Sequence, residues 1–379
     1  MASDLQRLAA RTLCVGFPGT EPSTGVLELI DRGVGGVVFF ARNVDTQPND
    51  VAALTTLLKQ RAGDRPLILG VDQEGGRVQR LRQGFSELPP MRALGSVNDP
   101  VLARKAGEVL GSECRAVGFD LDFAPVLDVD SNPDNPIIAT RSIARDAEVV
   151  TRLGLELIKG IQDAGVAACG KHFPGHGDTN QDSHLTLPTL KHDMQRLEAV
   201  ELPPFRAAAD ADIASIMTAH IIFEAIDTQH PATMSQPVIH GLLRQSMGYD
   251  GVVVSDDLEM KAIANNYAVP EAAVHAIAAG VDLLLCCHTN ELANESIDAI
   301  AQAVEDGRIP RERLEQANRR LDTLCQRFVV GPVDKPDLAC LDAAEHRDVV
   351  SEIRKRAEAA ALDAGIDPTE IMESIVKPT

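Results

Sequence analysis

The segment Lys171–Pro188, KHFPGHGDTNQDSHLTLP, concentrates one lysine, three histidines and two aspartates in a stretch with little helix or strand character. Asp182 and His184 lie two residues apart, so the carboxylate can fix the imidazole tautomer and raise its basicity. Such a dyad transfers protons near neutral pH, and the glycines and prolines around it would let the loop move over a substrate. In the simpler alternative, the loop covers the end of the fold and its histidines are solvated.

A second interpretation of this segment is a metal site, because it contains several side chains that bind zinc or manganese. Against it, Lys171 would place a cation beside the metal, and no other predicted strand end offers a His-x-His pair. We therefore expect no metal and no cofactor. The candidate ligands in this interpretation are His172, His176, Asp178, Asp182 and His184.

A candidate nucleophile lies in the run GVVVSDDLEM, where Asp256 and Asp257 follow a buried, β-branched stretch. A carboxylate at such a position can attack the anomeric carbon of a sugar and stabilise the cation-like transition state. Periodicity alone does not decide which aspartate points inward. Asp257 also suits a helix N-cap ahead of LEMKAIANN.

The elements that must position these groups alternate between short apolar runs and amphipathic helical patterns. The eight runs predict eight strands, the number that a (β/α)8 TIM-type barrel requires. An open doubly wound sheet is the alternative, but no GxGxxG turn follows the first run. The runs are LCVGF, GVVFF, LILGVD, FDLDFAP, VAACGKHF, ASIMTAH, GVVVSDD and VDLLLCC.

Polar residues fall near the carboxyl ends of at least five of these predicted strands, although any one of them could be a helix cap or a solvated charge. In a barrel, the carboxyl ends of the strands form the active-site face. The pattern therefore predicts a single polar site at that face. Its members are Asp72, Asp122, Lys171 with His172, His220 and Asp256.

We expect a single barrel domain over residues 1–330 and a linker with a helical C-terminal extension over residues 331–379. The linker is indicated by VVGPVDKPD, which contains two prolines. The helix is indicated by an alanine-rich and charge-rich run that begins near Cys340. Two long helices are also expected within the barrel domain. Each ends at a glycine suited to a helix C-terminus, Gly118 and Gly165.

Composition narrows the class of protein. The net charge of −20 argues against a general nucleic-acid or anionic-membrane surface. The N-terminal run resembles neither a signal peptide nor a membrane span, so a cytoplasmic location is expected. The seven scattered cysteines predict reduced core thiols. With no tryptophan and 3% aromatic residues, a long polysaccharide cleft with stacking platforms is disfavoured.

The motifs KHFPGHG, DSH and SDDLEM, with GVDQEGGRVQRL upstream, closely resemble the β-N-acetylglucosaminidases of glycoside hydrolase family 3, from about the first strand to Arg327. The resemblance implies a retaining double displacement in which Asp256 attacks the anomeric carbon. It also implies that His184 is the general acid/base and that Asp182 is its partner, where most glycosidases use a second carboxylate.

The same motifs imply a substrate-binding set in which Asp72 accepts hydrogen bonds from sugar hydroxyls and the cations donate to hydroxyl or acetamido oxygens. The register at Arg141 departs from the family pattern, since ATRSI stands where Gly-x-Arg-Ser-Phe is usual. Either arginine could instead belong to a structural ion pair. The implied set is Asp72, Arg80, Arg141, Lys171 and His172.

Many family members carry a second α/β domain after the barrel, which is not expected here. Single-domain members resemble cytoplasmic enzymes of peptidoglycan recycling that remove terminal N-acetylglucosamine from anhydro-muropeptides, so a small sugar substrate is expected. Two alternatives remain open at this point. A histidine acid/base would admit phosphate in place of water as acceptor, making the protein a phosphorylase. A barrel that has lost turnover would be a sugar-binding or sensing protein.

Overall fold

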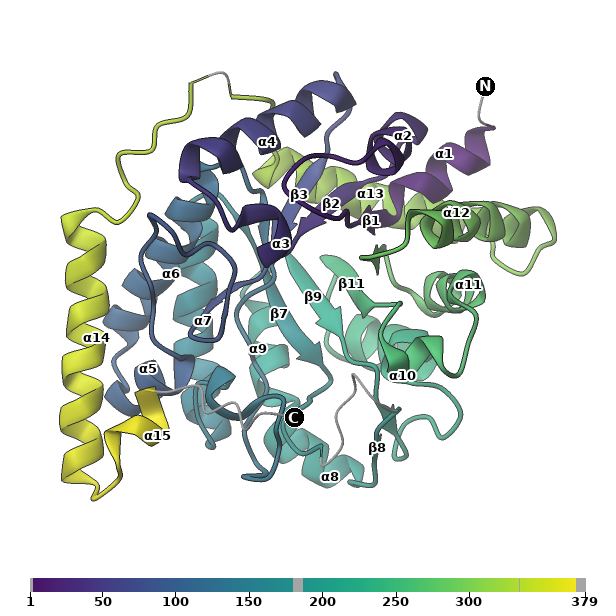
Figure 1. Cartoon of the computed structure of the whole chain (residues 1–379). Coiled ribbons are helices and arrows are strands. Elements are labelled where there is room, and N and C mark those ends of the chain that lie inside the picture. Colours follow the sequence, from purple (N-terminus) through teal and green to yellow (C-terminus); the bar gives the residue numbers. More distant parts are fainter. Residues whose placement is uncertain (1–2, 180–186, 334, 373–379) are drawn as a thin grey trace.

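The computed structural model describes residues 3–179, 187–333 and 335–372 and shows a closed barrel of parallel strands surrounded by helices (Figure 1). Neighbouring strands follow the order β1-β12-β11-β9-β7-β6-β3-β2, so the chain returns to β1 after one circuit. The predicted (β/α)8 barrel is confirmed, and each predicted run supplies one strand. The strands are β1 (Leu13–Val15), β2 (Gly36–Phe39), β3 (Ile68–Val71), β6 (Leu121–Asp122), β7 (Ala167–Phe173), β9 (Ser215–Thr218), β11 (Val252–Asp257) and β12 (Leu283–Cys286).

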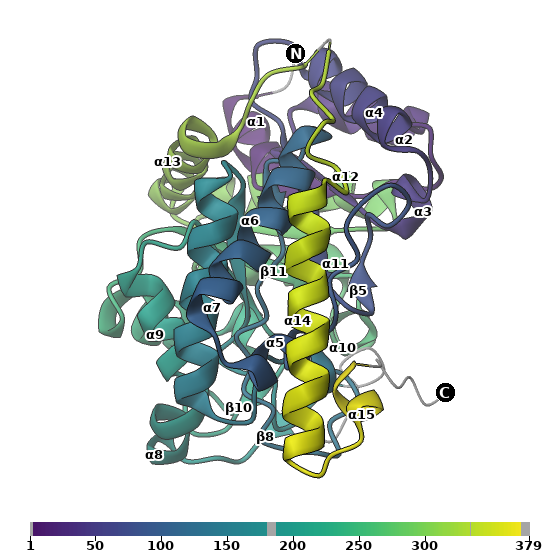
Figure 2. The same ribbon diagram turned by 90° about the vertical axis from the view of Figure 1, so that its left-hand side faces the viewer.

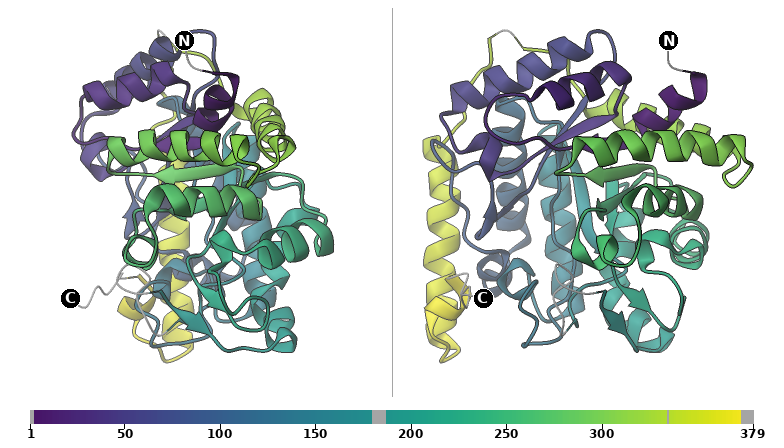
Figure 3. Two further views of the ribbon diagram at one scale, coloured as in Figure 1. Left: turned by 90° about the vertical axis from the view of Figure 1, so that its right-hand side faces the viewer. Right: turned by 45° about the vertical axis from the view of Figure 1, so that its right-hand side comes forward.

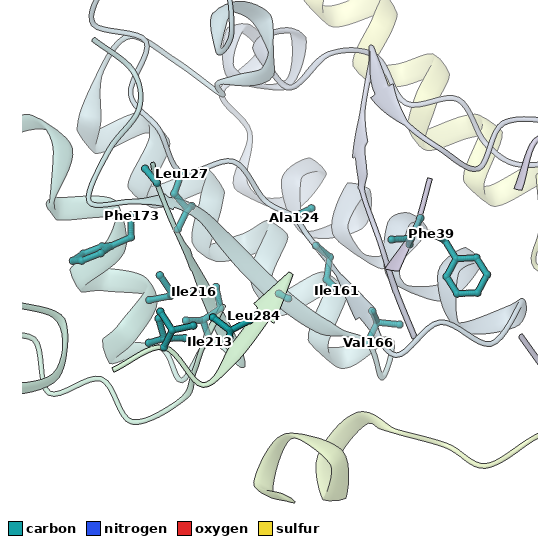
Figure 4. Packing of buried hydrophobic residues seen from close by; sticks show 14 of the residues in the cluster. Phe39, Ala124, Leu127, Ile161, Val166, Phe173, Ile213, Ile216 and Leu284 are labelled. Atoms are coloured by element: carbon teal, nitrogen blue, oxygen red, sulfur yellow. The ribbon is translucent and has the colours of Figure 1, made fainter. Parts of the chain in front are cut away.

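The strands close into a barrel because both of their faces are apolar. Val37 and Phe39 of β2 belong to the layer between strands and helices, whereas Val38 belongs to the cluster inside the barrel. This alternation follows the period of two of a strand. Figure 4 shows part of the outer layer, where Phe173 and Ile216 from neighbouring strands lie among buried hydrophobic side chains. Burial on both faces is the usual pattern for a parallel sheet.

Helices connect the strands and cover the barrel. The longer ones are α1 (Asp4–Arg11), α2 (Thr24–Arg32), α4 (Pro48–Ala62), α6 (Pro100–Ala116), α7 (Ala147–Asp163), α9 (Pro203–Asp210), α11 (Val269–Ala279), α12 (Asn290–Glu305) and α13 (Arg311–Phe328). Shorter ones are α3 (Ala41–Val44), α5 (Met91–Val97), α8 (Met194–Arg196) and α10 (Lys261–Ala264), with η1 (Ala139–Arg141), η2 (Leu197–Glu201), η3 (Ala232–Met234) and η4 (Pro237–Ser246). Two small sheets pair β4 (Gln73–Gly75) with β5 (Val78–Gln79) and β8 (Thr189–Leu190) with β10 (Ile222–Phe223).

The two long helices predicted from their terminal glycines end as expected. Gly118, two residues after α6, has φ +92°, and Gly165, two residues after α7, has φ +84°. Glycine adopts this left-handed conformation without the steric cost that a Cβ would impose. The chain therefore leaves each helix directly toward the next strand.

The residues after the barrel form α14 (Ala344–Asp363) and the short α15 (Pro368–Met372). Figure 2 shows α14 running alongside α6 and α5, and Figure 3 shows it on the opposite side of the barrel from α12. Ile353 and Ala357 are the buried contacts of this helix, together with Ala361. The predicted helix is therefore present, and it packs on the flank of the barrel.

Two further sequence expectations concern chemistry outside the site. All seven cysteines are free thiols; six of them are buried, as expected for core residues, and Cys340 is partly exposed. Within the described ranges, no helix is both long enough and apolar enough to cross a membrane.

Candidate active site

A cavity of about 240 Å³ opens at the carboxyl ends of the barrel strands and contains most of the residues predicted to do chemistry. Six of the predicted site residues line it together, although they come from distant parts of the chain. The barrel brings them together because the carboxyl ends of its parallel strands all lie at one face. These residues are Asp72, Arg80, Arg141, Lys171, His172 and Asp256.

A larger groove of about 830 Å³ lies near the start of β12, at the opposite end of the strands. Its arginines are committed to structure, because Arg244, Arg313 and Arg320 all contact the fully buried carboxylate of Asp282. The charges at this end of the barrel stabilise the fold, which is the usual role of that face. The chemistry therefore belongs to the smaller cavity.

Lys171 is at the centre of the polar wall of the cavity. Its Nζ lies 2.8 Å from Asp72 Oδ1 and 2.6 Å from Glu74 Oε1, and its side chain is buried. Glu74 also accepts two hydrogen bonds from the guanidinium of Arg141, at 2.9 and 2.8 Å. A buried lysine thus sits between two carboxylates, and a bidentate arginine holds the second one in place.

The charges in this network stabilise one another. Burial alone would raise the pKa of Glu74, but Arg141 and Lys171 outweigh it and hold that pKa well below its usual value. Burial would likewise lower the pKa of Lys171, and Asp72 and Glu74 raise it instead. Glu74 and Lys171 are therefore ionised at neutral pH, and the wall presents fixed charges to a polar ligand.

The hairpin that follows β3 returns Arg80 to the side of Asp72. The Arg80 N–H donates to the Asp72 carbonyl at 3.3 Å, and its Nη2 lies 3.6 Å from Asp72 Oδ2. The buried Nε of Arg80 has no hydrogen-bond partner among the described residues. Such a donor is costly to leave unmatched, so a ligand oxygen at this position would be favourable.

Asp128, in the segment after β6, orders the beginning of the loop that follows β7. Its carboxylate accepts from the N–H groups of His172, at 3.1 Å, and His176, at 2.7 Å, and lies 2.7 Å from His172 Nδ1. Although burial would raise its pKa, His172 and His176 keep the pKa of Asp128 below the usual value. Burial, reinforced by His172, lowers the pKa of His176 to about 4. A permanent carboxylate therefore orients the His172 ring in the cavity.

The structure distinguishes the two adjacent aspartates at the end of β11. Asp257 Oδ1 accepts from the N–H groups of Glu259, at 3.1 Å, and Cys287, at 3.2 Å, so its carboxylate anchors backbone. It is not a helix N-cap, because α10 begins later, at Lys261. Asp256 accepts from the N–H of Asp257 at 2.8 Å, and both aspartates line the cavity.

Asp256 is also electrostatically suited to remain an anion. Burial would raise its pKa, but His220, His172 and Lys171, with the Asp257 N–H, lower it below the usual value. His220 itself does not line the cavity, since its Nε2 bonds the Asp257 carbonyl at 2.9 Å and its Nδ1 contacts Thr233 at 2.8 Å. His220 therefore supports the end of β11 from outside the cavity.

The remaining candidates from the sequence are Asp122, Asp182 and His184. Asp122 does not line the cavity; it is buried on β6, where one oxygen accepts from the Gln73 N–H at 2.9 Å. A residue at the end of a barrel strand can point outward, and Asp122 does so because its neighbours in sequence, Leu121 and Phe123, point inward. Asp182 and His184 lie outside the described residues.

Several cavity residues were not predicted. Glu74 could have been found, because it lies two residues from Asp72 in GVDQEGG. Phe40 and His288, and Asp128 beside the cavity, carried no such signal, since their roles depend on neighbours far away in the chain. His176, which lines the cavity, was considered only as a candidate metal ligand. Within residues 3–179, 187–333 and 335–372, no three His, Cys, Asp or Glu side chains are arranged to hold a metal ion.

The comparisons with known proteins identify the family. The model of the glycosyl hydrolase family 3 N-terminal domain matches residues 18–324, which include every barrel strand except β1. The chain belongs to glycosyl hydrolase family 3. This family 3 protein is therefore a glycoside hydrolase, and its substrate is a sugar.

Relatives extend the likeness over most of the chain. A β-hexosaminidase from Thiobacillus denitrificans is 43% identical over 273 residues, which cover 70% of this chain and 75% of that protein. A β-hexosaminidase from Nitrosomonas eutropha is 38% identical over 321 residues, covering 82% of this chain and 91% of the relative.

Solved structures match equally well. A family 3 β-N-acetylglucosaminidase from a Paenibacillus species superposes with a TM-score of 0.88 at 44% identity, covering 94% of this chain and 69% of that one. NagZ from Neisseria gonorrhoeae, in complex with N-trifluoroacetyl-D-glucosamine, gives a TM-score of 0.77 at 31% identity, with 91% and 98% covered.

Proposed function

We propose that this glycoside hydrolase is a retaining exo-β-N-acetylglucosaminidase that removes terminal N-acetylglucosamine through a covalent intermediate on Asp256. The observation that carries the proposal is the separation of roles at the end of β11, where both aspartates line the cavity: Asp257 accepts from the N–H groups of Glu259 and Cys287, whereas Asp256 accepts from the Asp257 N–H and keeps a pKa below its usual value. The names of the relatives, β-hexosaminidase and β-N-acetylglucosaminidase, support N-acetylglucosamine as the sugar. The cavity of about 240 Å³ supports a single terminal unit, because it is smaller than the roughly 300–1,000 Å³ of common ligand pockets.

In the first step, Asp256 attacks the anomeric carbon, and His184 donates a proton to the departing glycosidic oxygen. In the second step, His184 takes a proton from water, which displaces Asp256 from the anomeric carbon. Two displacements at the same carbon restore its original configuration. Asp182 orients His184 and stabilises its charged form.

The polar wall would hold the sugar while this happens. Asp72 accepts hydrogen bonds from hydroxyl groups, and Lys171 and Arg141 supply fixed positive charge. Arg80, whose Nε is buried without a partner among the described residues, donates to a sugar oxygen, and His172 is held by Asp128 to do the same. Charges held rigidly in this way need no reorganisation during the reaction.

For the natural substrate we propose small peptidoglycan fragments, the anhydro-muropeptides, that carry a terminal N-acetylglucosamine. We propose that the enzyme acts on them in the cytoplasm. Comparing kcat/KM for such fragments with kcat/KM for chitin oligosaccharides tests this choice. A clear preference for the oligosaccharides would reject the substrate and leave the enzyme class in place.

The class is tested with nitrophenyl N-acetyl-β-glucosaminide, in buffer with chelator and without phosphate. We expect turnover by the wild type, none by Asp256→Ala, and a loss of about 10²- to 10⁴-fold for His184→Ala, the usual contribution of a positioned acid. A fully active Asp256→Ala enzyme would remove the nucleophile assignment. Proton NMR should show the β-anomer of the product first; the α-anomer would indicate inversion instead.

The phosphorylase alternative is settled in the same assay. Adding phosphate should leave the rate and the product unchanged if water is the acceptor. Appearance of a sugar 1-phosphate would identify phosphate as the acceptor and retain Asp256 as the nucleophile.

A further inference from the structure

The cavity has a second wall that the reaction described above does not use. Phe40 follows β2 and His288 follows β12, and both line the cavity. Because β12, β1 and β2 are consecutive in the barrel, these two rings lie on one side of the mouth. The charged cluster of Asp72 and Lys171 lies over β3 and β7, so the cavity has a wall of rings as well as a wall of charges.

The two rings form an ordered stack. Their centroids are 5.6 Å apart and their planes differ by 30°. The guanidinium of Arg42 lies over the Phe40 ring, 4.4 Å from its centroid. Arg42 is itself fixed, because its Nε donates to the Phe17 carbonyl at 2.9 Å and its Nη2 to the Cys287 carbonyl at 2.8 Å.

His288 is the exposed member of this stack. Its side chain is 51% exposed, yet its Nε2 lies 3.2 Å from Asp257 Oδ2 and its backbone N–H donates to Glu259 Oε1 at 2.7 Å. The ring is therefore held at its edge while a large part of its surface is free. A preorganised flat surface of this kind costs little entropy when a ligand packs on it.

The position of Asp256 indicates which part of the substrate meets this surface. Asp256 is the second-last residue of β11, which lies next to β12 in the barrel, so the reacting carbon would lie close to the ring wall. The charged wall suits the hydroxyl-rich terminal sugar. The rings suit the flat, partly apolar face of whatever is attached across the glycosidic bond.

We infer that Phe40 and His288 form a stacking surface for the leaving group, whether a second sugar ring or an aromatic ring. The inference rests on the proposed glycosidase function and deepens it, because it assigns the two rings to substrate selection. It also revises the expectation that a chain with 3% aromatic residues has no platform at its site: a short one is present, and one of its two rings is a histidine.

The test compares leaving groups in His288→Ala and Phe40→Leu enzymes. Ring contacts of this kind support a loss of roughly 3- to 10-fold in kcat/KM for nitrophenyl and disaccharide substrates. N-acetylglucosaminyl fluoride, whose leaving group has no ring, should lose almost nothing, and inhibition by free N-acetylglucosamine should be unchanged. His288→Phe should retain activity toward the ring-bearing substrates. His275→Ala, a half-exposed histidine outside the cavity, is the matched control.

Other outcomes would overturn the inference. An equal loss for the fluoride and the ring-bearing substrates, reproduced by Asp257→Asn, would show that His288 acts through Asp257 on the nucleophile. Weaker inhibition by free N-acetylglucosamine would place the terminal sugar on the rings. If the wild type had no turnover, the glycosidase proposal would fail, and calorimetric binding of the aryl glycoside and of free N-acetylglucosamine would still test the rings.

Discussion

At the scale of single residues, the site depends on buried charges that compensate one another. Glu74 is 2% exposed and has both Arg141 and Lys171 within 2.9 Å. An isolated ionised carboxylate at such a depth would be strongly destabilising. The cluster is stable because each charge has a partner. Removing one carboxylate would leave buried cations without full compensation and would destabilise the fold.

We predict that Glu74→Gln lowers the free energy of unfolding by about 3–5 kcal/mol at pH 7, the usual cost of breaking a buried ion pair. Since the folded state lowers the pKa of Glu74, its contribution is complete above the unfolded pKa of about 4.3 and is lost as pH falls through the folded value. Urea unfolding of both proteins from pH 7 downward checks this, and the difference between their free energies of unfolding should narrow only below about pH 4.

Glu224→Gln, at an exposed ion pair, is the control and should change stability by less than about 1 kcal/mol. A Glu74→Gln protein as stable as the wild type would contradict the prediction.

At the scale of elements, the C-terminal extension is attached to the barrel at two places. Ile353 and Ala357 of α14 are buried where that helix packs on α5 and α6. Glu113 of α6 is buried, and it accepts from the Asp342 N–H at 3.1 Å and pairs with His346 Nδ1 at 2.8 Å. We propose that residues 331–379 are an extension that can detach while the barrel, residues 1–330, remains folded.

Ile353→Ala should weaken this attachment by about 2–4 kcal/mol, from lost burial and the cavity that remains. Hydrogen exchange should then show faster exchange in α14 and unchanged exchange in the barrel strands. Leu362→Ala, at a residue that is 68% exposed, serves as the control and should have an effect within about 0.5 kcal/mol. Equal loss of protection in the barrel would show that the chain unfolds as one unit and that the boundary at residue 330 is wrong.

At the scale of the whole molecule, closing the barrel buries titratable groups that the unfolded chain exposes to water. His176 is 2% exposed, and its pKa falls to about 4. In the unfolded chain, histidine titrates near pH 6.5. The unfolded state therefore binds a proton that the folded state rejects, and acid favours unfolding.

This linkage predicts a stability loss of roughly 1.4 kcal/mol per pH unit from His176 between about pH 6.5 and 4, or roughly 3 kcal/mol in total. The contribution is fully present above pH 6.5 and is lost as pH falls toward 4. Urea unfolding of wild type and His176→Gln across this interval measures it: the curve of the variant should be flatter by that amount. His240→Asn, at an exposed histidine, should parallel the wild type. Parallel curves for His176→Gln and the wild type would refute the prediction.

The sequence by itself determined the elements and the face on which the chemistry lies. The runs that became β1 to β12 and the glycines at 118 and 165 are local signals, because strand periodicity and positive φ are properties of short segments. Residues at the carboxyl ends of the strands could therefore be assigned to one face of the barrel before any tertiary contact was known. Asp72, Lys171 and Asp256 were found in this way, with motif resemblance assigning their roles.

Only the tertiary structure decided which of these residues meet and which point away. Asp256 and Asp257 are adjacent and chemically alike, and they differ because Cys287, just after the neighbouring strand β12, donates its N–H to Asp257. Phe40 and His288, which are far apart in the chain, stack only because β1 and β12 pair and close the barrel. Such contacts depend on the closure of the barrel and on the register between its strands. Both are properties of all eight strands together, so no single segment of sequence determines them.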